Sequence, residues 1–454
     1  MPREVRYAWN GDVSLAYETV GAGAVDMLVL AGAPANLDVQ WENATYASFL
    51  RRLAEGRRLI LTDRRGTGLS DRFSASEPTP VESLTGDLAH VLDAARSDRA
   101  VIVAWGETCM VAQYFAATHP DRCAGLVMIT PVAVWRHSPD TPWMPTASEW
   151  EDIFADTKAR WGISPSPHPY ADDEERDWHM RFMRATQAPG ALVAEMRRWT
   201  QTDTRDVLAA IRVPTLILAD AEGTGYADPE SSRYIAARIP SSRLVVFPPG
   251  DWWFFPTERV LVEIAQFAAE LDSYDPVLDR VLATVLFTDI VDSTATAVEL
   301  GDRAWRDLLE RHHAVVRGAL RRWRGEELDV AGDGFFARFD GPARAIRCAG
   351  EITAGVRDLG LEVRAGVHTG ECEIVDGEIG GIAVHLGARI AALAGPGEVL
   401  VSSTVRDLVA GSGIEFRSWG VSKLKGFRGD WTLYAVRSAA TKGSDPVVAR
   451  PAPR

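Results

Sequence analysis

Two aspartates stand where β-rich runs of this sequence end, and carboxylates in such places can bind hard cations. Asp289 lies in FTDIVDST, directly after the apolar run at residues 283–287. Asp333 lies in VAGDGFF, where two β-rich runs meet at residues 331–334, a pattern that predicts a hairpin turn. A single Asp-Gly pair would indicate only a turn. Two carboxylates at the ends of adjacent strands predict a shared site for divalent cations.

The elements around these aspartates are predicted to form an α+β domain. Apolar periodicity and turn residues give, in order, a strand at 283–287, a helix at 302–324, a hairpin at 327–339, a helix at 343–359, a strand at 362–367, a helix at 382–394 and a strand at 398–402. His385 and Arg389 are four residues apart on the helix at 382–394, so they share one face of it.

The first 271 residues have a different pattern. Short β-rich runs alternate with amphipathic helices, which predicts a mostly parallel sheet covered by helices on both faces. Residues 132–202 interrupt this alternation and are rich in Trp, Pro and charge, as expected of a helical cap over the sheet. We therefore expect an α/β domain at 1–271, a linker at 272–282, the α+β domain at 283–437 and a disordered tail at 438–454.

Six motifs of the second domain resemble, in order, those of class III adenylate and guanylate cyclases, in particular actinobacterial forms fused behind an α/β-hydrolase domain. The resemblance covers essentially all of residues 283–437. It implies a ferredoxin-like domain that converts ATP or GTP into the 3′,5′-cyclic nucleotide and pyrophosphate. The motifs are FTDIVDST, GDGFF, VRAGVHTGE, GGIAVHLGARI, PGEVLVSSTV and KLKG.

The same resemblance implies roles for individual residues. Asp289 and Asp333, with the carbonyl of Ile290, would hold two Mg²⁺ or Mn²⁺ ions, and backbone N–H groups of residues 291–294 would cradle phosphate. Arg389 would steady charge on the α-phosphate. The basic residue that reaches the β- and γ-phosphates is one of two, Lys425 or Arg428 in KLKGFRG. Because such sites form between two cyclase domains, the resemblance also implies a head-to-tail homodimer with two equivalent sites.

Three positions depart from the family pattern. His385 replaces the usual Asn; it can still donate one hydrogen bond to substrate, or it has a purely structural role. Asp329 and Glu378 occupy the positions that recognise the purine. Glu378 could accept from adenine N6, whereas Asp329 could accept from guanine N1–H and N2–H₂. Each purine would therefore form the expected hydrogen bonds with only one of the two acids, or both acids face water and neither contacts the base. We expect ATP, the commoner substrate of the family, and leave GTP open.

The first domain resembles α/β-hydrolases of the epoxide-hydrolase and haloperoxidase type, through LAGAPAN, TDRRGTGLSDR, VIVAWGETC and FAATHPDR. Their nucleophile sits on a G-x-S-x-G elbow and needs a histidine from the loop after the last strand. Gly106 stands at the nucleophile position, and Trp252 and Trp253 stand in the histidine loop. The acid is undecided among three residues: Asp220, Glu222 and Asp228. We expect no Ser–His hydrolysis, and either a scaffold or a sensor with a pocket for an apolar small molecule.

Net charge, hydropathy and cysteine content exclude several classes of protein. The net charge of −14 argues against a general binder of nucleic acid or anionic membrane. The start has no signal-like apolar stretch and no segment reaches 18 apolar residues, which favours a cytosolic protein without a membrane anchor. Four scattered cysteines indicate neither disulfides nor zinc. The alternatives to a cyclase are a nucleotide- or ligand-binding regulator without catalysis and an esterase that uses Cys109 or Thr108.

Overall fold

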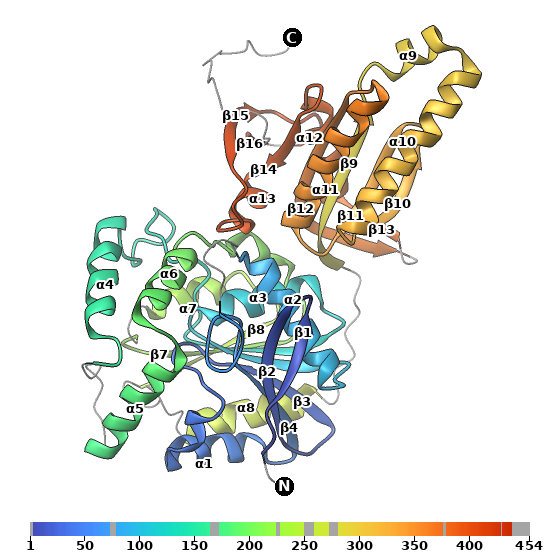
Figure 1. Ribbon diagram of the computed structural model, residues 1–454. Helices are drawn as coiled ribbons and strands as arrows, with labels where there is room; N and C mark the ends of the chain where they lie inside the picture. Colours follow the sequence, from blue (N-terminus) through green and yellow to red (C-terminus); the bar gives the residue numbers. More distant parts are fainter. Residues whose placement is uncertain are drawn as a thin grey trace.

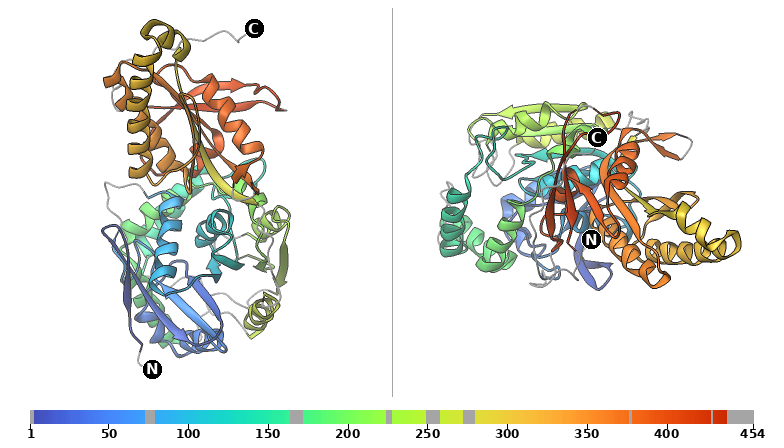
Figure 2. Two further views of the ribbon diagram at one scale, coloured as in Figure 1. Left: turned by 90° about the vertical axis from the view of Figure 1, so that its right-hand side faces the viewer. Right: turned by 90° about the horizontal axis from the view of Figure 1, so that it is seen from above.

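The computed structural model describes residues 3–72, 79–163, 172–223, 228–248, 258–271, 280–375, 378–427 and 429–437, without the side chains of residues 331, 374, 375 and 378. These residues form two mixed sheets, which are consecutive in the chain (Figure 1). The views in Figure 1 and Figure 2 agree that the second sheet and its helices lie at one end of the first part, with the N-terminus at the opposite end. The predicted tail at 438–454 lies outside the described residues, as does most of the predicted linker.

The first sheet has the strand order β1-β2-β4-β3-β5-β6-β7-β8. β1, β2 and β4 pair antiparallel, and every pairing from β4 to β8 is parallel. This confirms the predicted parallel sheet and adds an antiparallel edge. The bounds are β1 Arg6–Asn10, β2 Val13–Gly21, β3 Val25–Leu30, β4 Arg57–Thr62, β5 Ala100–Trp105, β6 Cys123–Ile129, β7 Thr215–Asp220 and β8 Ser242–Phe247.

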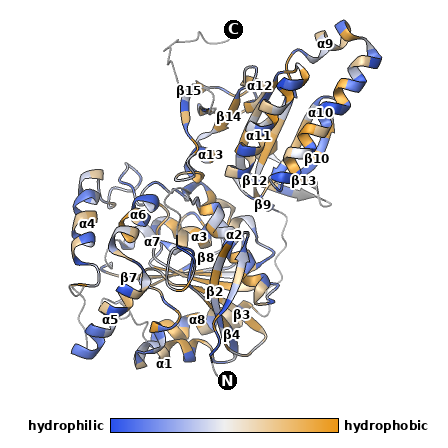
Figure 3. Cartoon of the chain, in the orientation of Figure 1, coloured by the Kyte–Doolittle hydropathy of each residue, from blue (hydrophilic) through white to orange (hydrophobic). Residues whose placement is uncertain are grey.

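Helices cover both faces of this sheet because neighbouring strand residues point to opposite sides. Leu28 packs into the cluster with α2 and α3, whereas Met27 and Val29 pack into the cluster with α1 and α8. Figure 3 shows the resulting apolar interior. The bounds are η1 Val39–Trp41, α1 Ala44–Leu53, α2 Val81–Ala94, α3 Thr108–Thr118, η2 Arg205–Ala210, α7 Pro229–Ala236 and α8 Glu258–Leu271.

The predicted cap contains three helices, α4 (Ala147–Arg160), α5 (Asp173–Thr186) and α6 (Pro189–Trp199). A capping box between Thr146 and Glu149 starts α4, and Trp150 packs its ring against Trp135 at 5.1 Å. Trp135 and Trp150 belong to the same apolar cluster as Met128 of β6, so these tryptophans of the cap pack toward the sheet below it.

The second sheet has the order β10-β11-β9-β12-β14-β16-β15, with β13 beside β12. β12 and β14 pair parallel and the other pairings are antiparallel. β9 begins at residue 280, three residues before the predicted run. The strands are β9 Arg280–Ile290, β10 Glu326–Ala331, β11 Gly334–Phe339, β12 Val363–Val375, β13 Glu378–Gly380, β14 Val399–Ser402, β15 Phe416–Ser422 and β16 Trp431–Val436.

Helices α10 and α11 pack on one face of the second sheet and α12 packs on the other. The long α10 and the short α9 project beyond the sheet (Figure 1). The predicted helices at 302–324, 343–359 and 382–394 are present, the second ending in a 3₁₀ turn. The bounds are α9 Ser293–Leu300, α10 Asp302–Arg322, α11 Pro342–Gly355, η3 Val356–Leu359, α12 Ile382–Leu393 and α13 Ser403–Leu408.

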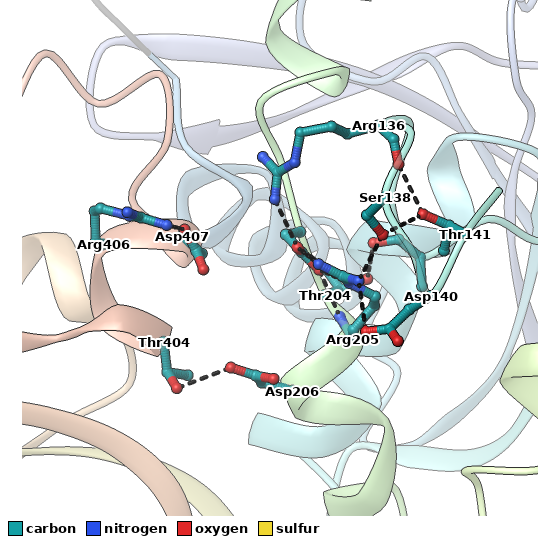
Figure 4. Close-up of polar contacts among 12 residues, drawn as sticks. Arg136, Ser138, Asp140, Thr141, Thr204, Arg205, Asp206, Thr404, Arg406 and Asp407 are labelled. Atoms are coloured by element: carbon teal, nitrogen blue, oxygen red, sulfur yellow. Dashed lines mark hydrogen bonds and ion pairs between the residues drawn. The ribbon is translucent and has the colours of Figure 1, made fainter. Parts of the chain in front are cut away.

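The two parts are in direct contact. Leu282 and Leu408 of the second part belong to the apolar cluster of the first. Arg212 forms an ion pair with Glu371 on β12. Figure 4 shows a further contact, in which the Thr404 hydroxyl of α13 donates to Asp206 of η2 at 2.9 Å. The cyclase-like part is therefore docked on the first part through polar and apolar contacts.

Two general expectations can be compared with the described residues. All four cysteines are buried and none is in a disulfide bond. None of the described helices has both the length and the apolar content needed to cross a membrane.

Candidate functional site

The site of the second part is built at the end of its central strand. β9 lies between β11 and β12, and Asp289 is its penultimate residue. The register pairs Thr288 with Phe335 on β11, so Asp289 and Ile290 lie at the same end of the sheet as the β10–β11 turn that contains Asp333. The three residues that the sequence predicts to bind metal therefore lie at one end of the sheet.

Asp333 occupies the turn of the β10–β11 hairpin, as predicted. Gly332 adopts a φ of 65°, and Ala331 pairs with Gly334 across the two-residue turn. The Asp333 Oδ2 atom is buried and has no hydrogen-bond partner among the described residues. A buried, unpartnered carboxylate oxygen is costly in the absence of a cation, so this atom fits a metal ligand.

Asp289 faces an open pocket of about 640 Å³. Arg364 on β12 lies opposite Asp289 in the register, and its Nε donates to Oδ2 of Asp289 at 3.0 Å. Arg364 belongs to the motif VRAGVHTGE, but the motif alone does not indicate a role for it. The proximity of Arg364 to Asp289 arises from the pairing of β12 with β9, two strands that are far apart in the sequence. The pocket is lined by Asp289, Ile290, Asp292, Ser293, Thr294, Ala295, Val298 and Arg364.

The start of α9 forms one wall of this pocket. Asp292, in the left-handed region at φ 54°, precedes the helix, and no side chain caps its first turn within the described part of the chain. Uncapped N–H groups at a helix start can bind an anion. One expected donor is excluded, because the Val291 N–H donates to the Glu362 carbonyl at 2.9 Å. The predicted phosphate cradle therefore reduces to residues 292–294.

No cluster of three or more His, Cys, Asp or Glu side chains occurs in the described ranges. Two carboxylates are nevertheless consistent with Mg²⁺ or Mn²⁺, since Mg²⁺ usually takes one or two carboxylates and completes its shell with water and substrate phosphates. The donors Asp289, Asp333 and the Ile290 carbonyl are all oxygen, as hard cations prefer.

The predicted partners on α12 do not line the pocket. His385 and Arg389 are exposed on the outer side of the helix, and neither side chain has a hydrogen bond or ion pair within the described residues. The inner side is fixed by Gly387, where an added Cβ would lie 2.7 Å from Val285. The two residues share a face, as the four-residue spacing predicts.

The predicted base-recognition and phosphate residues lie elsewhere. Asp329 is exposed on the edge strand β10, and its Oδ1 accepts from the adjacent Val330 N–H at 2.8 Å. Glu378 begins β13, but its side chain is not described. Lys425 is exposed between β15 and β16, and Arg428 lies outside the described residues.

One histidine of α10 supports the metal-site turn. His313 is at hydrogen-bond distance from the Gly332 carbonyl, with Nε2 and oxygen 3.1 Å apart, and its ring packs edge-on against Phe335 at 5.0 Å. The neighbouring His312 is buried, has no partner for either ring nitrogen in the described structure, and has its pKa lowered to about 4 by burial. His313 is therefore a positioning residue, and sequence reasoning misses it because its contact with Gly332 joins a helix to a distant turn.

The elbow of the first part keeps its shape without a nucleophile. Gly106 has a φ of 51° and its N–H donates to the Ile129 carbonyl at 2.9 Å. The Thr108 hydroxyl donates to backbone carbonyls. Burial raises the pKa of the Cys109 thiol well above its usual range, so the thiol is held protonated. None of these three groups provides an activated nucleophile.

A buried ion network fills the space beside the elbow. Glu107 accepts from the Ala33 N–H at 3.0 Å and pairs with Arg64 at 3.3 Å, and Arg64 also pairs with Glu195. Burial raises the pKa of Glu107, and Arg64 opposes this shift. The adjoining cavity, lined by Arg64 and Leu84 among others, measures about 20 Å³ and has room for roughly one water. The loop with Trp252 and Trp253 lies outside the described residues.

Comparison with known proteins matches each of the two parts to a family. Residues 27–258 match the family model of the alpha/beta hydrolase fold, and residues 278–438 match that of the adenylate and guanylate cyclase catalytic domain. An epoxide hydrolase B of Mycobacterium tuberculosis is 37% identical over 75 residues, 16% of this chain and 21% of that one. "Putative adenylate cyclase 3" of Rhizobium meliloti is 30% identical over 156 residues, 32% of this chain and 26% of that one.

An uncharacterized protein of M. tuberculosis is 30% identical over 125 residues, 27% of this chain and 33% of that one. The chain thus spans a third or less of the length of these curated relatives. The two family matches follow one another in the order that the sequence predicted. The chain belongs to the α/β-hydrolase fold family and carries, C-terminal to that fold, a class III adenylate and guanylate cyclase catalytic domain.

Proposed function

We propose that this protein is a nucleotide cyclase that converts a purine nucleoside triphosphate into its 3′,5′-cyclic nucleotide and pyrophosphate. The observation that carries the proposal is that Asp289, Ile290 and Asp333 lie at the same end of the sheet, where Oδ2 of Asp333 is buried without a partner among the described residues. Two Mg²⁺ or Mn²⁺ ions bound there would activate the ribose 3′-hydroxyl and neutralise charge on the leaving pyrophosphate.

The chain's own groups would orient the triphosphate. The first-turn N–H groups of α9 and the guanidinium of Arg364 face the same pocket, so both can donate to phosphate oxygens. Arg364 can leave Asp289 for phosphate once a cation takes its place on that carboxylate. Lys425, exposed between β15 and β16, is a second candidate for the β- and γ-phosphates, and Arg428 remains the alternative.

We further propose that the working unit is a head-to-tail homodimer. Arg389 and His385 point outward from α12, so within one chain they do not line the pocket that Asp289 faces. Exposed apolar side chains accompany both surfaces: Val298 at the pocket is 81% exposed and Ile382 at the start of α12 is 67% exposed. A second copy would cover these side chains and supply Arg389 to the first copy's phosphates.

ATP is the proposed substrate and GTP the alternative. Asp329 is exposed on an edge strand, and one of its oxygens stays free to accept from a purine. The test is product formation by the purified full chain with Mn²⁺, supplied in parallel with ATP, GTP, CTP and UTP. A cyclic purine nucleotide supports the proposal, and the ATP-to-GTP rate ratio settles the base. Nucleotide binding without any cyclic product would instead support a non-catalytic regulator.

The hydrolase-like part is proposed to regulate the cyclase and to have no hydrolytic turnover of its own. Gly106 offers no nucleophile, Cys109 is held as a thiol, and the Glu107–Arg64–Glu195 network occupies the elbow region. We propose that an apolar small molecule, bound near Trp252 and Trp253, is the ligand through which this part regulates the cyclase. Hydrolysis of a short-chain p-nitrophenyl ester that disappears in Cys109→Ala or Thr108→Val would revive the esterase alternative.

A further inference from the structure

Helix α11 of the cyclase domain begins without a cap of its own. Its N-cap residue is Gly341, which has no side chain, and its first residue is Pro342, which has no N–H. The next N–H, that of Ala343, donates to Oε2 of Glu82 at 2.8 Å. Glu82 lies in the first turn of α2, in the hydrolase-like domain. One domain therefore caps a helix of the other.

The fit around this cap is close. The Glu82 residue is only 6% exposed, and a Cβ added at Gly341 would lie 2.0 Å from its Cδ, so only glycine permits the approach. Arg344 also faces the carboxylate, with its Nε 3.7 Å from Oε1 of Glu82, while it binds Asp340 at 2.7 Å. The contact is thus a buried hydrogen bond from a backbone N–H to a carboxyl oxygen, beside an arginine.

The capped helix continues directly from the strand that carries the metal site. β11 runs from Gly334, next to Asp333, to Phe339, and α11 starts three residues later. Phe335, Phe339 and Ala343 belong to the same apolar cluster as Ile290. A shift at the start of α11 is therefore passed through a packed unit to the turn that holds Asp333.

We propose that Glu82 is a positioning residue for the cyclase site: it fixes β11 and Asp333 by capping α11, and its protonation controls how firmly the two domains dock. The proposal rests on the proposed cyclase function for its consequence on turnover, but its structural part stands on the interface alone. Two further polar contacts across the interface, Arg212 with Glu371 and Asp206 with Thr404, involve β12 and α13, whereas Glu82 bonds to the start of α11.

The direction of the pH effect follows from burial. Burial raises the pKa of Glu82 to about 7, against the opposing effects of Arg344 and the Ala343 N–H, while Asp340 raises it further. Two groups at the interface on α3 are neutral at pH 7: burial raises the pKa of Tyr114 well above its usual range and lowers that of His119. In the undocked state an exposed glutamate titrates near 4.5.

The docked state therefore holds a proton on Glu82 more tightly than the undocked state does. Docking must strengthen as the pH falls from above 7 toward 4.5, and weaken as the pH rises through 7. Between pH 8 and pH 6 the docking equilibrium is expected to change roughly tenfold. Glu82→Gln keeps the acceptor for the Ala343 N–H and removes the charge, so it should dock firmly at every pH.

Hydrogen exchange of the Ala343 amide measures the docking equilibrium directly. The experiment uses the full chain without nucleotide, and the rates are corrected for the intrinsic pH dependence of exchange. Wild-type protection should rise roughly tenfold from pH 8 to pH 6. Glu82→Gln should be highly protected with no such rise, and Glu82→Ala should lose about fivefold, as a missing helix cap does. The Tyr46 amide on α1, capped by Asn43 of its own domain at 2.9 Å, is the matched control and should not respond.

Cyclase rates of the same three chains complete the test. Glu82→Gln should flatten the pH 6–8 profile of kcat and retain the rate, while Glu82→Ala lowers it. Two results would overturn the docking role. One is Ala343 protection in Glu82→Gln that changes with pH as in the wild type, and the other is Ala343 protection in Glu82→Ala that equals that of the wild type. Altered exchange with identical kcat profiles would overturn the positioning role. Absence of product from the wild type would refute the proposed cyclase function. The exchange measurements would then still test the docking role of Glu82, because they need no cyclase activity.

Discussion

Arg364 and Asp289 face each other across β12 and β9, with the Nε atom of the arginine 3.0 Å from Oδ2 of the aspartate. Both side chains are about one-third exposed. The arginine thus contacts the carboxylate that is proposed to bind metal. A guanidinium and a divalent cation compete for the same oxygen, and the released guanidinium is close enough to bind phosphate.

The first prediction concerns this competition. Arg364→Gln should tighten Mn²⁺ binding in the absence of nucleotide by about two- to fivefold, the range expected for removing a partly exposed ion pair. The KM for the nucleotide should rise, because a phosphate donor is lost. Calorimetric Mn²⁺ titration measures the first effect. Arg322→Gln removes another exposed ion pair, with Glu351, and is the control. Equal Mn²⁺ affinity in wild type and Arg364→Gln would contradict the competition.

The second prediction separates two adjacent histidines. His313→Ala removes the hydrogen bond to the Gly332 carbonyl and should weaken Mn²⁺ binding up to about fivefold, since one hydrogen bond contributes about 1 kcal/mol. His312→Leu should leave Mn²⁺ affinity unchanged and raise Tm, because it replaces a buried imidazole without a partner in the described structure. Loss of Mn²⁺ affinity in His312→Leu, with His313→Ala unaffected, would reverse the assignment.

The third prediction tests the composite site. Asp289→Ala and Arg389→Ala chains should each be inactive alone. Mixed in equal amounts, half of the dimers are heterodimers and each has one intact site of two, so roughly a quarter of the wild-type rate should return. Differently tagged chains report whether mixed dimers form. Mixed dimers without recovered activity would exclude Arg389 acting from the second chain.

Sequence alone was sufficient for those parts of the site that are local. Asp333 was placed on its turn because Ala331 to Gly334 is a hairpin signature, and Asp289 because an apolar run ends beside it. Arg364 needed the pairing of β12 with β9, and Glu82 needed the docking of two domains. Both are contacts between distant segments that periodicity does not encode. The Val291 N–H was expected to bind phosphate, but it donates instead to the carbonyl of Glu362, the residue before β12, and this contact depends on the pairing of β9 with β12.

The same distinction holds for the hydrolase-like domain. The missing nucleophile at Gly106 could be read from the elbow motif, since the position follows a buried strand. The ion network around Glu107 could not, because Arg64 and Glu195 come from a loop and a cap helix far apart in the chain. The proposed apolar ligand remains a prediction of the sequence, because its loop lies outside the described residues.

The most direct test of the cyclase assignment is cyclic-nucleotide formation by Asp333→Asn, measured with Mn²⁺ and with Tm recorded on the metal-free chain. The cyclase account predicts that product formation is abolished while Tm stays the same or rises, because the amide removes a charge whose buried Oδ2 lacks a partner in the described structure. Asp302→Asn, at an exposed aspartate of α10, should retain full activity. Wild-type product formation by a folded Asp333→Asn chain would contradict the assignment.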